Sequence, residues 1–316
     1  NLYSGNATNG TTISTGHTND LIWTKGRAGT YGGRGLRIID SVRGATKVLY
    51  GDQDLAEGTN NSSSGVTGFG STDYTIGGDA DFNGASSTYV SWTWKIQAGV
   101  CDIQTYTGNG SARTISHNLG VVPKMMIIKK RNTAAPWSVG HASLGANQVL
   151  ELNATDAVAT DATYWNNTRP TSSVFTVGTD GNQNTNTHTY LIYLFGNKQG
   201  VSRMGKYIGN GNADGTFVYT GFKPAFVMQK STTTTYGWQI YDNKRGGFNP
   251  ENDELVANLD SAETDGSGNG FPDFYSNGFK LRNTDINKNA SGVTYIYMAF
   301  AENPFVTSTG VPATAR

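Results

Sequence analysis

Three short stretches of the chain place acidic and amide side chains at alternate positions, which is how a calcium-binding loop begins. A calcium ion needs several oxygens converging from one tight turn. The Glu that completes an EF-hand loop is missing, and Asx side chains in a turn also bond their own backbone. We favour ordinary turns and keep calcium as the alternative, with no other cofactor expected. The candidate ligands are Asp79, Asp81, Asn83, Asp180, Asn182, Asn184, Asp285, Asn287 and Asn289.

A second motif, Asp-x-x-Arg-Gly, occurs as Asp40-Ser41-Val42-Arg43-Gly44 and as Asp242-Asn243-Lys244-Arg245-Gly246. In the second copy of the repeat described below, the corresponding stretch is Trp137-Ser138-Val139-Gly140-His141, which has neither the Asp nor the Arg. The pattern fits a turn in which Asp accepts backbone N–H groups and pairs with Arg. We favour that structural role over ligand binding.

Signatures of catalysis are weak. The four histidines lack the spacing of metal ligands, Cys101 is the only cysteine, and no Gly-x-Ser-x-Gly elbow occurs. Glycoside hydrolysis needs only two carboxylates, so pairs such as Asp40 with Glu57, or Asp242 with Glu254, keep that activity open. We expect a protein that is not an enzyme. The histidines are His17, His117, His141 and His188.

Aromatic side chains have two possible uses in this chain. At alternate strand positions they pack a core, whereas an exposed Trp or Tyr gives a flat surface on which a sugar ring stacks. Four aromatics fall in Gly-, Thr- and Asn-rich surroundings and are therefore predicted to be exposed and glycan-binding. They are Trp137, Trp165, Tyr236 and Trp238.

The elements that must position these residues are repeated three times. The first landmark is Tyr-x-Gly-Asn, as Tyr3-Ser4-Gly5-Asn6, Tyr106-Thr107-Gly108-Asn109 and Tyr207-Ile208-Gly209-Asn210. An apolar run ending in a basic residue follows in each copy, at 21–25, 125–129 and 225–230. Such conserved order within one chain indicates internal duplication.

The third landmark is an aromatic terminal strand, at 89–94, 190–195 and 295–300. Its alternation predicts one face turned toward a core. A short strand precedes it, at 74–77, 175–178 and 279–282, and we expect the two to form a hairpin.

The repeats predict three all-β domains, each a β-sandwich resembling a jelly roll, at residues 1–104, 105–205 and 206–305. Short linkers suggest that they sit end to end, although the sequence leaves open a pseudo-threefold arrangement. Residues 306–316 are expected to be a tail that leads to a partner or a continuation.

Charge and composition limit the classes of binding partner that the chain can have. Lys plus Arg and Asp plus Glu number 24 each, so no basic surface for nucleic acid is expected. No apolar run is long enough for a membrane helix, which argues against membrane insertion. The 41 glycines and a charged fraction of only 15% suit a turn-rich β protein.

The series 40–47, Glu57-Gly58-Thr59 and 89–95 resembles a poorly characterised repeat domain found in virion proteins of marine tailed bacteriophages. The second and third copies keep its skeleton in their Gly-Asn-Gly openings, in 222–227 and in 276–281. The resemblance covers nearly the whole chain and implies a structural role in the virion, without catalytic residues.

The sequence thus predicts a virion structural protein, a tail fibre or surface appendage that contacts a host surface or neighbouring virion proteins. Homo-oligomerisation is expected, and a fibre would suit a trimer. The alternatives are a capsid decoration protein, a carbohydrate-binding module that recognises a host-surface glycan, and a polysaccharide depolymerase.

Overall fold

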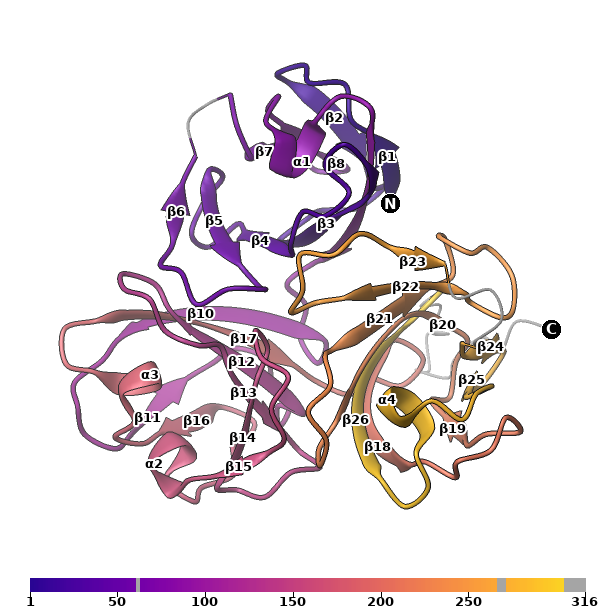
Figure 1. The fold of residues 1–316 in the computed structure, drawn as a ribbon. Helices are drawn as coiled ribbons and strands as arrows, with labels where there is room; N and C mark the ends of the chain where they lie inside the picture. Colours follow the sequence, from indigo (N-terminus) through magenta and orange to yellow (C-terminus); the bar gives the residue numbers. More distant parts are fainter. Residues whose placement is uncertain (61–62, 266–270, 304–316) are drawn as a thin grey trace.

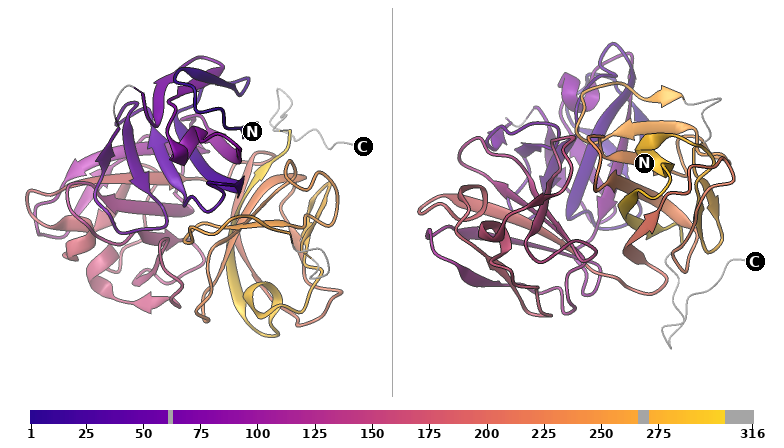
Figure 2. Two further views of the ribbon diagram at one scale, coloured as in Figure 1. Left: turned by 45° about the horizontal axis from the view of Figure 1, so that its top comes forward. Right: turned by 60° about the horizontal axis from the view of Figure 1, so that its bottom comes forward.

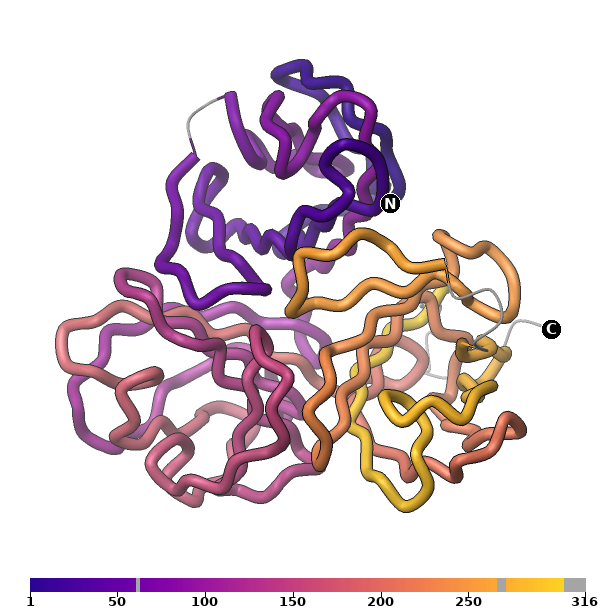
Figure 3. The backbone as a smooth tube through the Cα atoms, viewed as in Figure 1, coloured from indigo at the N-terminus to yellow at the C-terminus, as the bar shows by residue number. Residues whose placement is uncertain are grey.

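Three lobes surround a common centre in the computed structural model, which describes residues 1–60, 63–265 and 271–303 (Figures 1 and 3). Each lobe pairs a six-stranded antiparallel sheet with a smaller sheet, and the prediction of an all-β sandwich fold is confirmed. The tail predicted at residues 306–316 lies outside the described residues. Within the described ranges, no helix has the length and apolar character needed to cross a bilayer.

Lobe 1 contains the first nine strands and one short helix. Its elements are β1 (Leu2–Ser4), β2 (Thr11–Ser14), β3 (Leu21–Gly29), β4 (Arg37–Asp40), β5 (Lys47–Tyr50), β6 (Gly58–Thr59), β7 (Val66–Phe69), β8 (Asp73–Ile76), α1 (Ala80–Asn83) and β9 (Ser87–Trp94). The large sheet has the order β1-β9-β3-β4-β5-β6, and the small sheet has the order β2-β8-β7.

Lobe 2 repeats this order but replaces one strand of the small sheet with a helix. Its elements are β10 (Cys101–Thr107), β11 (Arg113–Ser116), β12 (Met125–Lys130), β13 (Ser138–His141), β14 (Gln148–Glu151), β15 (Ala159–Thr160), α2 (Ala162–Trp165), β16 (Val174–Val177), α3 (Gly181–Asn184) and β17 (Thr189–Phe195). The large sheet has the order β10-β17-β12-β13-β14-β15, and β11 pairs with β16.

Lobe 3 returns to the arrangement of lobe 1. Its elements are β18 (Ser202–Ile208), β19 (Phe217–Tyr219), β20 (Pro224–Ser231), β21 (Gln239–Asp242), β22 (Asp253–Val256), β23 (Thr264–Asp265), β24 (Asp273–Tyr275), β25 (Gly278–Lys280), α4 (Ile286–Asn289) and β26 (Thr294–Ala301). The large sheet has the order β18-β26-β20-β21-β22-β23, and the small sheet has the order β19-β25-β24.

The terminal strands differ from the hairpin expected from the sequence. β8 pairs with β2 and β7 in the small sheet, whereas β9 pairs with β1 and β3 in the large sheet. A single turn of helix, α1, carries the chain from one sheet to the other. The hairpin prediction is therefore wrong, because the Asp/Asn segment forms a helix that crosses between layers.

Each terminal strand is buried on both of its faces. In β17, Leu191, Tyr193 and Phe195 face the centre of the molecule, whereas Ile192 and Leu194 face the core inside lobe 2. The same alternation holds in β26, whereas in β9 only Val90, Trp92 and Trp94 lie in an apolar core, the central one, and they alternate with Ser91 and Thr93. A strand buried on two faces needs an almost continuous apolar sequence.

Three aromatic rings meet in the central core, one from the end of each terminal strand. Trp94 lies 5.4 Å from Phe300 and 6.2 Å from Phe195 between ring centroids, and Phe195 lies 6.0 Å from Phe300. All three pairs are edge-to-face, the arrangement that aromatic quadrupoles favour. The lobes therefore close around one shared core instead of extending end to end, as the views in Figure 2 also show.

The borders predicted at 104/105 and 205/206 fall inside β10 and β18. Both strands pair along their whole length with the terminal strand of their own lobe. The turns between lobes come earlier, near Gln97 and Lys198, because the Tyr-x-Gly-Asn landmark marks the end of the first strand.

Candidate functional site

The Asp/Asn stretches build a bracket that recurs in all three lobes. In lobe 2, Asp180 caps α3 by accepting the backbone N–H of Asn182 at 2.7 Å. Asn184 is fully buried, and its amide nitrogen donates to two backbone carbonyls at 2.7 Å each. Its Oδ1 atom accepts the N–H of Asn109 at 3.0 Å. The amide thus fastens α3 to the end of β10.

The Tyr-x-Gly-Asn landmark is the other half of this bracket. Tyr106 stacks on Tyr190 at 5.1 Å, and its hydroxyl donates to the carbonyl of Gln183 at 2.8 Å. A Cβ at Gly108 would lie 2.1 Å from the carbonyl oxygen of Thr185, so only glycine fits. The corresponding pairs are Tyr3 with Tyr89, Tyr207 with Tyr295, Asn6 with Asn83 and Asn210 with Asn289.

The remaining candidate calcium ligands lie in the same brackets. Asp79 and Asp285 cap α1 and α4. Asp81 instead binds Arg37 at 3.0 Å, Asn182 donates to a tyrosine hydroxyl, and the backbone N–H of Asn287 donates to the cap. Over the described ranges, no group of three His, Cys, Asp or Glu side chains could hold one metal ion. Calcium binding stays a prediction, and every bracket has protein hydrogen bonds of its own.

The first Asp-x-x-Arg-Gly motif lies at the seam between lobes 1 and 2. Arg43 binds Asp40 at 2.6 Å and Glu57 at 3.1 Å. Arg131 of lobe 2 binds the same Glu57 at 2.8 Å, and Tyr193 of lobe 2 donates to Asp40 at 2.8 Å. Asp40 also accepts the backbone N–H of Arg43 at 2.9 Å, so the predicted turn is present and its Asp also takes part in joining two lobes.

The charges at this seam stabilise one another. Burial opposes the charge of Arg43, but Tyr193, Asp40 and Glu57 together raise its pKa above the usual value. Burial also opposes the charge of Glu57, and the hydrogen bond from Arg131 with the field of Arg43 keeps its pKa below the usual value. Both groups are charged at neutral pH.

The second motif forms the same network between lobes 3 and 1. Arg245 binds Asp242 at 2.7 Å and Glu263 at 2.9 Å. Arg27 of lobe 1 binds Glu263 at 2.7 Å, and the indole of Trp92 donates to Asp242 at 2.9 Å. Two of the three seams thus carry an Arg–Glu–Arg chain anchored on a buried Asp.

The seam between lobes 2 and 3 has lost this network. His141 and Leu144 stand where the Asp and Arg would be, and Val158 and Thr232 replace the Glu and the second Arg. The N–H of Val158 donates to the carbonyl of Thr232 at 2.9 Å, so the backbone link survives. Burial lowers the pKa of His141 to about 4, and its Nε2 atom lies 3.3 Å from the carbonyl of Tyr297. Buried ion pairs can be exchanged for apolar groups with little loss of stability.

The carboxylates considered for glycoside hydrolysis all have cationic partners in the structure. Asp40 and Glu57 share Arg43, and Asp242 binds Arg245. Glu254 binds Lys288 at 3.0 Å and accepts the hydroxyl of Tyr241. These carboxylates act as acceptors in structural networks.

One buried lysine crosses each seam. Lys129 donates to the carbonyl of Asp54 in lobe 1 at 2.8 Å, Lys25 donates to Leu259 in lobe 3 at 2.5 Å, and Lys230 donates to Thr155 in lobe 2 at 3.1 Å. Burial lowers the pKa of each lysine to about 8. These lysines end the apolar runs of the second landmark, which gives that basic position its structural reason.

The tryptophans predicted to be exposed are buried. Trp137 and Trp238 lie at seams, where their indole N–H groups donate at 2.8 Å to the carbonyls of Tyr50 and Glu151 in the preceding lobe. Trp165 is buried in lobe 2 and donates to Gln148 at 3.0 Å. Tyr236 is half-buried. Gly- and Thr-rich surroundings misled the prediction, because lobe contacts that the sequence does not show cover these segments.

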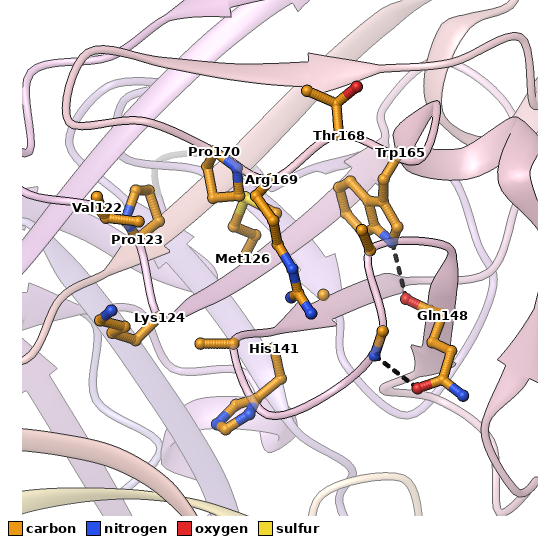
Figure 4. A pocket seen from close by; sticks show the side chains of 14 residues that line it. Val122, Pro123, Lys124, Met126, His141, Gln148, Trp165, Thr168, Arg169 and Pro170 are labelled. Carbon is orange, nitrogen blue, oxygen red and sulfur yellow. Dashed lines mark hydrogen bonds between the residues drawn. The ribbon is translucent and has the colours of Figure 1, made fainter.

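A cavity of about 270 Å³ opens beside Trp165 in lobe 2 (Figure 4). Met126 and Gly140 of the large sheet line it together with Lys124 and Arg169 from flanking loops. A Cβ at Gly140 would lie 2.9 Å from the Trp165 ring, so the glycine makes room for the indole. Of the four aromatic candidates, only Trp165 faces this cavity.

One family model matches residues 1–304, and therefore spans all three lobes. The chain belongs to the family described as a domain of unknown function, DUF7483. Comparison with the curated proteins and with the solved structures finds no match. The repeated unit detected in the sequence is thus one third of what the family model describes.

Sequence reasoning missed three exposed aromatics of this DUF7483 chain that lie together on the small sheet of lobe 3. Tyr219 is 63% exposed, and Phe217 and Tyr275 are also exposed. Tyr219 and Tyr275 both align with Gly278 of the strand between them, so they share one face. The alternation in Phe217-Val218-Tyr219 was the available signal.

A second cavity, of about 500 Å³, lies between lobes 1 and 3 beside the central aromatic rings. Trp94, Phe226 and Phe300 line it. Asn1 and Glu302 also lie on its wall, so both ends of the described chain meet there.

Proposed function

We propose that this chain is a structural module of a virion, a fibre or surface appendage that contacts a host surface or neighbouring virion proteins. The observation that carries the proposal is that the charged motifs of this chain make structural contacts. The networks around Asp40 and Asp242 and the seam lysines hold one lobe to the next, and the Asp/Asn brackets hold helices to strands. Residues that suggested chemistry thus support a rigid closed unit whose outer loops remain available for contact.

The resemblance to virion repeat domains supplies the biological setting of the proposal. Three lobes closed around one core suit the exposed surface of a particle. A loop on such a surface can open locally while the core stays folded. A single chain already places three lobes around one centre, so a monomer competes with the homotrimer expected for a fibre. Sedimentation equilibrium distinguishes the two by mass.

The test is to locate the chain on purified particles. Mass spectrometry of density-banded virions should detect it, and gold-labelled antibody against the purified chain should mark the tail or its fibres. Labelling spread over the shell would replace the fibre with a capsid decoration protein. Absence from purified particles would overturn the structural role.

Glycan contact is a second candidate function, favoured by the exposed aromatic face of lobe 3. Phe217, Tyr219 and Tyr275 lie together there, and stacking on such rings is how flat sugar faces are bound. Glycan-array binding that is lost in Tyr219→Ala and kept in the control Leu2→Ala, an exposed residue in lobe 1, would support a carbohydrate-binding module. Binding that survives Tyr219→Ala would remove this face from consideration.

A further inference from the structure

The cavity in lobe 2 lies beside a strand position at which this lobe departs from its sister lobes. Gly140 of β13 occupies the place that Ile39 fills in β4 and Tyr241 fills in β21, and both of those side chains are buried in their lobe cores. Lobe 2 also has α2 where the other lobes have a third strand in the small sheet. The Trp165 indole packs over Gly140 and forms one wall of the cavity.

The charged side chains that line this space are cationic. Lys124 and Arg169 both face it, and no carboxylate is among the lining residues. In the described part of the chain neither cation forms an ion pair, although Arg169 donates to the carbonyl of Leu144. Figure 4 shows the Arg169 guanidinium reaching into the cavity between Lys124 and Trp165. Two cations without a counter-charge create a positive site.

The other polar groups of the cavity add no further charge. His141 uses both ring nitrogens, because Nδ1 accepts the N–H of Ser143 at 3.1 Å and Nε2 faces the carbonyl of Tyr297. It is therefore neutral at pH 7. The Oε1 atom of Gln148 accepts the N–H of Gly145 at 2.6 Å, which fixes the loop on the far side.

The remaining walls of the cavity are apolar, which indicates that a ligand must also present an apolar face. Met126, Trp165, Pro123 and Pro170 surround the cations. The volume of about 270 Å³ lies just below the range of about 300–1,000 Å³ that holds drug-sized ligands, which suits a single ring. A sugar ring with C–H faces and a single carboxylate matches both the apolar walls and the positive side.

We propose that the lobe 2 cavity binds the terminal uronate residue of an acidic polysaccharide, with Arg169 and Lys124 holding its carboxylate. Arginine presents paired donors that match the two oxygens of a carboxylate, and lysine adds a point charge. The proposal names a ligand for the surface contact proposed above, and it rests on that proposed function only for where the ligand comes from. Binding itself is a property of the isolated chain.

The experiment titrates the purified chain with sodium glucuronate and sodium galacturonate in ligand-observed NMR. Glucose, galactose and sodium sulfate serve as the neutral-sugar and anion controls. The variants are Arg169→Gln and Lys124→Gln, with Lys206→Gln, an exposed lysine of lobe 3, as the matched control. Arg169 is exposed, so its replacement is expected to leave the melting temperature unchanged.

We expect a uronate to bind at least tenfold more tightly than its neutral sugar, and to weaken as salt increases. Each cavity variant should weaken binding about tenfold, whereas Lys206→Gln should not change it. Binding unaffected by both cavity variants, or sulfate bound as tightly as uronate, would overturn the proposal. Absence of any uronate binding would overturn it too and would leave the virion location, tested separately on particles, untouched.

Discussion

Arg43 and Arg245 show how single residues decide what a seam between lobes is made of. The side chain of each is fully buried and sits between an Asp of its own turn and a Glu that also binds the neighbouring lobe. The third seam does without any of these charges. Because isolated buried charges are costly but complete networks are not, partial replacement should be worse than full replacement.

The first prediction concerns that seam. Arg43→Leu alone leaves Asp40 buried without a cation and Glu57 with Arg131 only, and we expect it to lower the free energy of unfolding by about 3–5 kcal/mol. Adding Asp40→His and Glu57→Val, the residues of the third seam, should recover most of this loss. Urea denaturation measures both. Arg34→Leu is the control, since its pair with Asp81 is partly exposed and worth about 1 kcal/mol or less. A triple variant less stable than the single one would contradict the network interpretation.

The second prediction concerns the seam lysines. Lys129 has a folded pKa of about 8, below its unfolded value of 10.5. Between those pH values the unfolded chain holds more protons, so raising the pH favours the folded state. The stability of the wild type relative to Lys129→Met should therefore increase from pH 8 to pH 10, as followed by denaturant unfolding. For Lys206→Met, at an exposed site, the difference in stability from the wild type should not change with pH. An equally flat difference for Lys129→Met would mean that its ammonium is solvated.

At the scale of elements, each one-turn helix owes its place to contacts beyond itself. A helix of four residues is unstable alone. α3 is held because Asn184 binds carbonyls on both sides of it and because β10 ends against it at Gly108. The alternating Asp/Asn pattern therefore indicates a tertiary contact between the one-turn helix and the end of the first strand of the lobe.

The third prediction tests the close approach at this junction. In Gly108→Ala the new Cβ would meet the carbonyl oxygen of Thr185, so we expect a loss of about 1–3 kcal/mol or more. Gly181→Ala, in α3 itself, meets nothing closer than 3.5 Å and should be neutral or slightly stabilising. Thermal unfolding of the pair measures the difference. Equal effects from the two substitutions would show that the bracket is looser than described.

The fourth prediction separates hydrogen bonds from metal in the same brackets. Their oxygens already accept backbone N–H groups, so removal of calcium with a chelator should leave the melting temperature unchanged. Any ligand that binds only the folded chain raises stability with concentration. A melting temperature that climbs with added calcium would reinstate the brackets as metal sites.

At the scale of the whole molecule, the shared core makes the lobes interdependent. Each large sheet buries one face against the other two lobes through Trp94, Phe195 and Phe300. In linear repeat proteins a unit contacts only its neighbours and can unfold separately. A closed ring of three lobes has no free end, so unfolding one lobe exposes the central faces of the others.

The fifth prediction follows from this closure. Calorimetry should show one unfolding transition for the three lobes, with calorimetric and van't Hoff enthalpies in agreement. Phe195→Ala should cost about 3–5 kcal/mol and weaken hydrogen-exchange protection in all three lobes. Phe175→Ala, in the core of lobe 2 alone, is the comparison for local loss. Three separate transitions would show that the lobes are independent domains.

The amino-acid sequence alone determined the all-β class, the three copies and the strand landmarks, because strand alternation and duplication are local properties that each segment carries by itself. It also pointed to turns at the Asp/Asn and Asp-x-x-Arg-Gly motifs. The sequence predicts Trp137 and Trp238 at the surface, because nothing nearby in the chain shows that another lobe covers them.

Only the tertiary structure decided that the copies close around one core, that Asp40 and Lys129 bind the neighbouring lobe, and that Gly140 makes room for Trp165 beside a cavity. Each of these depends on residues that lie far apart along the chain, and spacing within one segment does not specify which distant segment will pack against it. The physical reason is burial on two faces: the second face of each large sheet acquires its partner only when all three lobes are present.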